Sequence, residues 1–283
     1  MSEVIQNVSD TSIWVAHYRA VESNLPEPLF KDPYASMLVG DRAPSIESIE
    51  SQVSKFTRWV VVIRTYIIDQ MIIDLISKGV TTFLNVGAGL DSRPYRMDLD
   101  PQLKWIEVDF PHVIEHKKNC LDKYKPNCEL ERIGFDISNR SSRQSLFDKI
   151  ARNHQKVAVI TEGVLPYLTE EQVSEFSEDL IRNPNIEYWI CEYFSPKVYR
   201  YLKDPKRTKV LKNAPFQFYP ENWMNFFESR EWKLSQLQYY TEVSESLGRP
   251  TPMPYILKLL EFVMGKQWAA PLKRMTGFMV WER

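Results

Sequence analysis

The feature that most constrains the fold is a regular alternation of short apolar segments with longer helical ones. Four segments have the length and apolar character of buried strands: Thr81–Val86, Leu103–Val108, Val157–Thr161 and Tyr188–Cys191. A fifth strand is expected at Leu130–Phe135, which is less apolar. Helical patterns separate most of them, at Val113–Tyr124, Ser142–Asn153 and Glu170–Arg182. Apolar strands that alternate with helices form a parallel sheet covered on both faces. We therefore predict an α/β fold with a Rossmann-like, mostly parallel sheet.

The end of the chain departs from a purely parallel arrangement. A predicted helix at Pro220–Ser229 leads to a strand at Trp232–Tyr240, and Gly277–Trp281 is a last strand candidate. These two strands would close the sheet as an antiparallel hairpin and bring it to seven strands. Residues 241–275 would then be a long insertion in the hairpin. Its mostly apolar part, Tyr255–Met264, suggests a lid over a binding pocket.

The first 78 residues are predicted to be helical. Residues 10–39 have the pattern of helix, turn and helix, because Pro26 and Pro28 break the first helix. Residues 46–78 carry apolar side chains at helical spacing, and Gly79 ends that segment. We predict one domain over residues 1–283, which consists of a helical cap (1–78), a sheet core (79–240 and 276–283) and a lid-like insertion (241–275).

Composition excludes several classes of function. Lys and Arg number 36 and Asp and Glu 37, so no excess of cations indicates binding to nucleic acid. The three cysteines are odd in number and form no CxxC motif, which indicates neither a disulfide framework nor a metal site. The most apolar run, Trp59–Ile76, contains charged residues and does not suit a membrane span. No signal peptide is apparent, and we expect a cytoplasmic protein.

Two glycines follow the first predicted strand, in the sequence Phe83–Arg93 (FLNVGAGLDSR). Gly87 and Gly89 would let the backbone approach a ligand closely, although a tight structural turn would need them as well. The third glycine of a dinucleotide-binding fingerprint is missing, because Ser92 stands three residues after Gly89. This spacing disfavours a site for a dinucleotide pyrophosphate.

Carboxylates stand at the ends of three predicted strands. Asp109 lies 20 residues after Gly89 and could accept hydrogen bonds from both hydroxyls of a ribose. Asp136 could accept from an adenine amino group, and Glu162 could pair with the ammonium group of a methionine moiety. The alternatives are helix caps for Asp109 and Asp136 and a structural ion pair for Glu162. Ligands bind at this edge of open α/β sheets, so the three together are more specific than any one.

Arg64 lies in the apolar sequence Trp59–Tyr66 and calls for an anion. The carboxylate of a methionine moiety would suit its planar guanidinium, and so would a structural acid. Both NAD and S-adenosylmethionine need a carboxylate such as Asp109. The missing glycine and the additional Asp136 favour S-adenosylmethionine. An NAD-dependent oxidoreductase and a cofactor-binding protein without catalysis remain as alternatives.

The sequence resembles the leucine carboxyl methyltransferase family, especially the bacterial branch that includes the tetracenomycin polyketide O-methyltransferase. The most specific motifs are Val86–Arg96 (VGAGLDSRPYR) and Thr161–Leu168 (TEGVLPYL). The other segments that carry the resemblance are Thr11–Ala20, Phe30–Tyr34, Val108–Pro111, Gly248–Pro250 and Met275–Gly277. Together they extend over nearly the whole chain.

The resemblance implies a methyltransferase that uses S-adenosylmethionine and leaves S-adenosylhomocysteine. The acceptor would be an oxygen, in a carboxylate or a hydroxyl, of a small molecule or peptide. The cofactor-binding residues would be Arg64, Gly87, Gly89, Asp109, Phe110, Asp136, Ile137, Glu162 and Gly163. The N-terminal helices would cover the cofactor. The candidates for the acceptor pocket are His17, Tyr18, Arg19, Tyr167 and Tyr193. No motif assigns a catalytic base.

Overall fold

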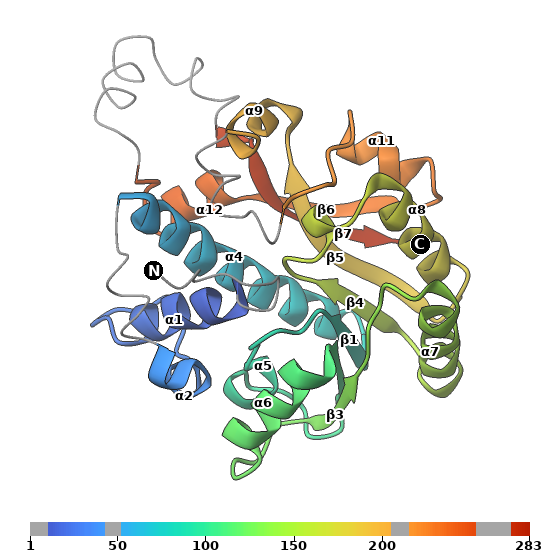
Figure 1. The fold of residues 1–283 in the computed structure, drawn as a ribbon, viewed down its shortest axis with the longest axis horizontal. Coiled ribbons are helices and arrows are strands. Elements are labelled where there is room, and N and C mark those ends of the chain that lie inside the picture. The colour runs from blue at the N-terminus through green and yellow to red at the C-terminus, as the bar shows by residue number, and fades with distance from the viewer. Residues whose placement is uncertain (1–10, 43–51, 205–214, 253–272) are drawn as a thin grey trace.

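The structure is a computed structural model of the chain, and it describes residues 11–42, 52–204, 215–252 and 273–283. At its centre lies a seven-stranded sheet with the order β3-β2-β1-β4-β5-β7-β6 (Figure 1). The strands are β1 (Thr82–Val86), β2 (Lys104–Asp109), β3 (Glu129–Gly134), β4 (Val157–Thr161), β5 (Ile186–Phe194), β6 (Lys233–Tyr239) and β7 (Thr276–Glu282).

The pairing of the strands confirms the predicted fold class. Strands β1 to β5 are parallel, and β7 runs antiparallel to both β5 and β6. Strand β5 is longer than the predicted Tyr188–Cys191, because it pairs with β7 as far as Phe194, opposite Thr276. The charge of Glu192 hid this extension in the sequence. Its side chain lies inside the protein.

One face of the sheet is covered by α7 (Arg140–Asn153), α8 (Glu170–Ile181) and α11 (Trp223–Glu228). Aromatic side chains dominate this side of the core, and Trp189 of β5 contacts Phe176, Phe227 and Trp232. Helix α8 begins with a capping box, in which Thr169 and Gln172 satisfy each other's backbone N–H groups.

The opposite face is covered mainly by α4 (Gln52–Ser77) and α12 (Tyr240–Ser246). The buried residues of α4, Ile63 to Leu75, pack on apolar side chains of β1, β4, β5 and β7. Three shorter or peripheral elements connect the strands: α5 (Arg93–Arg96) after β1, α6 (Pro111–Leu121) after β2, and α9 (Tyr199–Leu202) after β5. The 3-10 turns η3 (Leu165–Tyr167) and η4 (Pro196–Val198) lie after β4 and β5.

The predicted pair of N-terminal helices is present as α1 (Thr11–Ser23) and α2 (Ala35–Val39), with the 3-10 turn η2 (Gly40–Arg42) after them. Their apolar residues form a separate cluster with Leu90, Tyr95 and Leu121. Helix α1 also packs against α4. The N-terminal helices therefore lie against the segment that follows β1. This is the position expected of a cover over that end of the sheet.

The predicted insertion begins as part of the packed structure. Helix α12 follows β6 at once, and Tyr240 is buried against Phe278 of β7. The predicted lid segment, Tyr255–Met264, lies outside the described residues, so its role stays a prediction. Among the described residues, no helix is both long and apolar enough to cross a bilayer.

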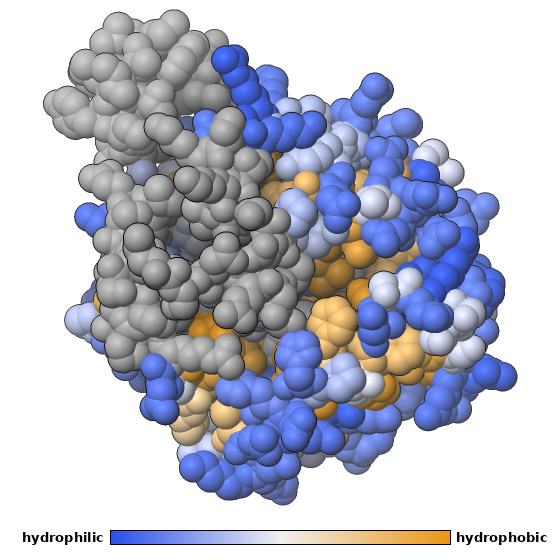
Figure 2. Space-filling view, viewed as in Figure 1, coloured by the Kyte–Doolittle hydropathy of each residue, from blue (hydrophilic) through white to orange (hydrophobic). Residues whose placement is uncertain are grey.

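Seen from the same side, the surface has apolar residues near its centre and hydrophilic ones around its border (Figure 2). Few large apolar side chains of the described residues are exposed, and Phe110, just after β2, is one of them at 39%. An exposed aromatic ring at the end of a strand is a natural contact for a flat ligand group.

Candidate functional site

The sheet order brings the predicted cofactor-binding residues to one edge. Asp109 is the last residue of β2, Asp136 lies two residues after β3, and Glu162 directly follows β4. The turn of Gly87 and Gly89 follows β1, between β2 and β4. Because these strands are parallel neighbours, their carboxyl ends lie side by side, at the edge where open α/β sheets bind ligands.

The turn after β1 requires glycine at Gly87 and Gly89. Both have positive φ angles, +69° and +46°, which other residues rarely adopt. A Cβ atom at Gly87 would collide with Val164, and one at Gly89 would press on Ser12 of α1. The glycines therefore allow the segment after β4 and the start of α1 to close over the turn.

Asp109 holds this turn in place. Its Oδ2 accepts a hydrogen bond from the Gly89 N–H at 2.6 Å, and its Oδ1 accepts one from the Phe110 N–H at 2.7 Å. Burial raises the pKa of Asp109, and these two backbone donors only partly oppose the rise. The carboxylate is half-buried, next to the exposed Phe110 ring, which stacks on His112. Asp109 is thus both a structural acceptor and accessible to a ligand.

The region after β3 is more open. Asp136 is exposed, and its carboxylate accepts a hydrogen bond from the Ser138 N–H at 2.9 Å. Ile137 is half-buried against the core, and its carbonyl accepts from Arg143 at 2.8 Å. With Phe110, these residues offer an apolar surface and a carboxylate acceptor, which is the combination that an adenine ring needs.

Glu162 lies between two guanidinium groups. Its Oε2 accepts from Arg93 at 2.8 Å, and its Oε1 lies 2.8 Å from Nε of Arg64. Burial alone would raise the pKa of Glu162, but Arg64 and Arg93 together hold it below its usual value. Glu162 therefore takes part in structural ion pairs, which was the alternative to a pairing with a ligand ammonium group.

Arg93 is the centre of a buried ionic network that sequence reasoning missed. Only 2% of the residue is exposed, and it also donates to Asp69 at 2.7 Å and to Asp91 at 2.8 Å. Arg96 binds Asp69 through two hydrogen bonds. The signal was available, because Asp69 interrupts an apolar helix and a buried carboxylate needs a cation.

Arg64 has an ionic partner but retains donors. Its Nε faces Glu162 without the alignment of a hydrogen bond, and the described residues accept no hydrogen bond from its guanidinium. Burial would lower the pKa of Arg64, and Glu162 and other acidic groups raise it, so the side chain stays charged. The contact to the methionine carboxylate stays a prediction, and unused N–H groups are what such a contact requires.

Next to Gly163 lies Glu192, an acid that the sequence analysis did not single out. Its N–H donates to the carboxylate of Glu192 on β5, whose other oxygen is buried without a hydrogen-bond partner. The charge of Glu192, in a strand of otherwise apolar and aromatic residues, was the available signal.

The candidates for the acceptor pocket lie in different surroundings. His17 and Tyr18 are buried in α1. Arg19 donates to Asp32 at 2.8 Å and to the Leu90 carbonyl at 2.6 Å, which fastens α1 to the segment after β1. Tyr167 hydrogen-bonds with the Thr11 side chain and so lies beside the start of α1. Tyr193 packs on Trp223 and Tyr239, on the sheet face opposite α4.

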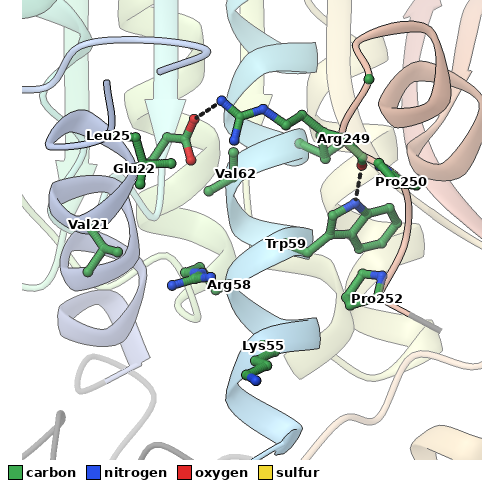
Figure 3. Close-up of a pocket in the computed structure, with 12 residues that line it drawn as sticks. Val21, Glu22, Leu25, Lys55, Arg58, Trp59, Val62, Arg249, Pro250 and Pro252 are labelled. Carbon is green, nitrogen blue, oxygen red and sulfur yellow. Dashed lines mark hydrogen bonds and ion pairs between the residues drawn. The ribbon is translucent and has the colours of Figure 1, made fainter. Parts of the chain in front are cut away.

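A pocket of about 310 Å³ lies between the end of α1, the start of α4 and residues 248–252 (Figure 3). Trp59 forms its wall and donates to the Arg249 carbonyl at 3.0 Å, and Lys55 and Arg58 also line it. Arg64 comes two residues after Val62 of the lining, about 200° around the helix. The pocket therefore lies on the face of α4 opposite Arg64.

A sequence model described as leucine carboxyl methyltransferase matches residues 12–180, from α1 to the end of α8. The chain belongs to the leucine carboxyl methyltransferase family. This confirms the resemblance found in the sequence. The matched region contains every predicted cofactor-binding residue, from Arg64 to Gly163, and four of the five predicted pocket residues, all except Tyr193.

Proteins similar to this chain carry consistent descriptions. A Mycobacterium ulcerans protein described as "Putative S-adenosyl-L-methionine-dependent methyltransferase" is 27% identical over 188 residues, which are 59% of this chain. The chain spans 59% of the length of that relative. A Frankia alni protein with the same description is 24% identical over 265 residues, which are 89% of this chain and 92% of the relative.

Solved structures show the same fold. A Thermobifida fusca structure described as a "putative methyltransferase" has a TM-score of 0.55 and 15% identity, over 95% of this chain and 94% of that one. A duf574 family protein from Streptomyces avermitilis has a TM-score of 0.53 and 10% identity, over 95% and 96%.

Proposed function

We propose that the protein is an S-adenosylmethionine-dependent O-methyltransferase that methylates a carboxylate or hydroxyl oxygen of a small molecule or peptide. The observation that carries the proposal is the edge formed by β1 to β4. It combines a glycine turn, an accessible Asp109, the exposed pair Phe110 and Asp136, and a charged Arg64 with unused donors. Family membership and the names of the relatives support it.

In this proposal each residue of the edge binds one part of the cofactor. Asp109 accepts from the ribose hydroxyls, Asp136 and Ile137 bind the adenine with Phe110, and Arg64 binds the methionine carboxylate. Gly87, Gly89 and Gly163 line the cofactor, and Glu162 keeps Arg64 charged and in place. When bound, the cofactor supplies a methyl group on a positively charged sulfur. The protein contributes position, which can supply roughly 7–11 kcal/mol of the barrier reduction.

The nature of the acceptor decides whether a base is needed. A carboxylic acid with a pKa of about 4 is ionised at neutral pH, whereas a phenol with a pKa of about 10 benefits from a general base. We propose that His17, Tyr18, Arg19, Tyr167 and Tyr193 surround the acceptor, with the insertion 241–275 as the lid. The three free cysteines fit a reducing compartment, and we propose a cytoplasmic location.

An NAD-dependent oxidoreductase is the second candidate, and one observation disfavours it. The position of the third fingerprint glycine is taken by Ser92, which is buried and donates to Asp32 at 2.6 Å. A side chain held there removes the close helix–strand packing that the third glycine allows in a dinucleotide-binding fingerprint.

Radiolabelled S-adenosylmethionine tests the proposal directly. The protein is incubated with the labelled cofactor and with panels of carboxylic acids, phenols and amines, and the products are separated. We expect label in a base-labile ester or in a stable ether. Label in amines only would contradict an oxygen acceptor. Binding of NAD without binding of S-adenosylmethionine would contradict a methyltransferase, and tight cofactor binding without transfer to any acceptor would favour a non-catalytic binding protein.

A further inference from the structure

Glu192 is a buried acid that the proposed cofactor contacts do not use. It lies on β5, on the sheet face that packs against α4, and only 2% of it is exposed. One carboxylate oxygen accepts a hydrogen bond from the Gly163 N–H, and the other is buried without a partner. A buried, half-satisfied carboxylate is costly when ionised, so this group is poised to hold a proton.

The groups around Glu192 come from four elements. Arg64 faces it from α4, Glu162 from the end of β4, Tyr167 from η3 and Tyr240 from α12. Of these only Arg64 is cationic, and it is already paired with Glu162 at 2.8 Å. Burial therefore raises the pKa of Glu192 to about 7, and Glu162 adds to the rise against the opposing effects of backbone donors and Arg64.

The neighbouring ionic network is balanced without Glu192. Its connected side chains are the four arginines Arg19, Arg64, Arg93 and Arg96 and the four carboxylates Asp32, Asp69, Asp91 and Glu162. An ionised Glu192 would add a negative charge that no cation of this network matches. A ligand that brings one positive charge to the same place would match it.

The two ligands of the proposed reaction differ by that charge. S-adenosylmethionine carries a positive sulfonium in addition to its amino and carboxylate groups, whereas S-adenosylhomocysteine has a neutral sulfur. Glu192 is joined through Gly163 to Glu162, and Glu162 binds Arg64, the proposed contact of the methionine end. Glu192 therefore lies where its charge and that of the sulfonium interact through a medium of low dielectric constant.

We propose that Glu192 is the charge-matching residue for the sulfonium: it is largely protonated in the free protein below neutral pH, releases that proton to solvent when S-adenosylmethionine binds, and takes a proton back when S-adenosylhomocysteine remains in the site. This inference rests on the proposed function and deepens it, because it makes the site selective for the charged cofactor over its uncharged product. A neutral Glu192 accompanies the neutral sulfur, and an ionised Glu192 accompanies the sulfonium.

The proposal fixes the direction in which the affinity for S-adenosylmethionine changes with pH. A cationic ligand favours the ionised form, so below pH 7 its binding must first remove a proton, and its affinity rises with pH. With a pKa of about 7 in the free protein, the ionised fraction and hence the affinity rise about tenfold from pH 6 to pH 8. At pH 7 binding should release about half a proton per site. For S-adenosylhomocysteine this group contributes no proton release and no pH dependence.

Calorimetry in buffers of different ionisation enthalpy measures these protons. S-adenosylmethionine and S-adenosylhomocysteine are titrated at pH 7 into the wild-type protein, Glu192→Gln and the control Glu228→Gln, which removes an exposed acid on α11. We expect S-adenosylmethionine to release about half a proton per site more from the wild type and the control than from Glu192→Gln. Subtracting the Glu192→Gln result removes any proton exchanged by the ligand's own amino group.

Each outcome decides one of the two proposals. Equal proton release with S-adenosylmethionine from the wild type and from Glu192→Gln would overturn the role of Glu192 while leaving the methyltransferase intact. Absence of binding by either ligand to the wild type would instead overturn the proposed function. At pH 6 the amino groups of both ligands stay protonated, so the two ligands can be compared on the wild-type protein even if Glu192→Gln does not fold. Equal proton release with both ligands at that pH would overturn the role of Glu192.

Discussion

The two ends of the proposed cofactor site are built in opposite ways. Near the predicted methionine end, Arg93 is buried with Asp69 and Asp91, and it pairs with both of them and with the half-buried Glu162. Near the predicted adenosine end, Asp109 and Asp136 accept only backbone N–H groups and remain accessible. The charged groups at the first end form ion pairs within the protein, whereas the carboxylates at the second end are available to a ligand. Substitutions should therefore affect stability at the first end and cofactor affinity at the second.

The largest effect is expected for Arg93→Met, which tests the structural end. The change leaves Asp69, Asp91 and Glu162 without their shared cation, and breaking a buried pair in this way costs about 3–5 kcal/mol. Denaturant unfolding of the variant should show this loss in the free energy of unfolding. Arg152→Met, at an exposed arginine of α7, serves as the control and should change it by less than about 0.5 kcal/mol. A similar, small change in both variants would mean that the network does not hold the fold.

A smaller effect, and of a different kind, is expected for Asp109→Ala at the adenosine end. The loss of charge-assisted hydrogen bonds to the ribose should weaken S-adenosylmethionine binding by about 1.5–3 kcal/mol, while the fold persists. Calorimetric affinity and a thermal melt check the two parts, with Asp98→Ala as an exposed control. Unchanged affinity together with a sharp fall in melting temperature would make Asp109 only the clamp of the glycine turn.

Arg64 combines the properties of both ends, because it has a structural partner in Glu162 and N–H groups that remain available to a ligand. Arg64→Lys keeps the charge and loses the planar fork, which should weaken S-adenosylmethionine by about 1 kcal/mol. Binding of 5′-methylthioadenosine should change little, because that ligand has no methionine carboxylate. If both ligands weaken equally, Arg64 acts through Glu162 and the fold.

The smallest effect is expected for Asp136→Ala. Asp136 is exposed, so a hydrogen bond to the adenine amino group competes with water and should contribute about 0.5–1 kcal/mol to binding. Competition between adenosine and inosine, which lacks that amino group, provides the measurement. The wild type should prefer adenosine and the variant should lose this preference. A preference that survives the substitution would place the adenine elsewhere.

The sheet and the edge could be predicted because their signals are local. The inner strands are mostly apolar segments with polar boundaries, whereas the edge strands β3 and β6 carry more polar residues. Asp109, Asp136 and Glu162 were recognisable because each comes at or just after the end of a predicted strand. Helix α4 was evident from apolar residues at helical spacing. These patterns depend only on residues that are close in the sequence, so a single sequence is enough to recognise them.

The ionic network could not be predicted with the same means, because its partners come from α4, the turn after β1 and the end of β4. Asp69 and Arg93 are 24 residues apart, and Arg93 and Glu162 are 69 apart. Which acid meets which base depends on tertiary packing. Glu192 and Tyr193 illustrate the same limit. The sequence analysis chose Tyr193 as a candidate for the acceptor pocket. Side chains alternate along β5, so the adjacent Glu192 points to the other face, toward α4 and Arg64.

The structure of the complex with S-adenosylhomocysteine tests the central claim most directly. The account predicts the ligand at the carboxyl edge of β1 to β4, with its ribose hydroxyls on Asp109, its adenine beside Phe110 and Asp136, and its carboxylate on Arg64. A ligand found in the pocket between α1 and α4, on the opposite face of α4 from Arg64, would contradict the account. So would a ligand at the predicted edge whose ribose does not contact Asp109.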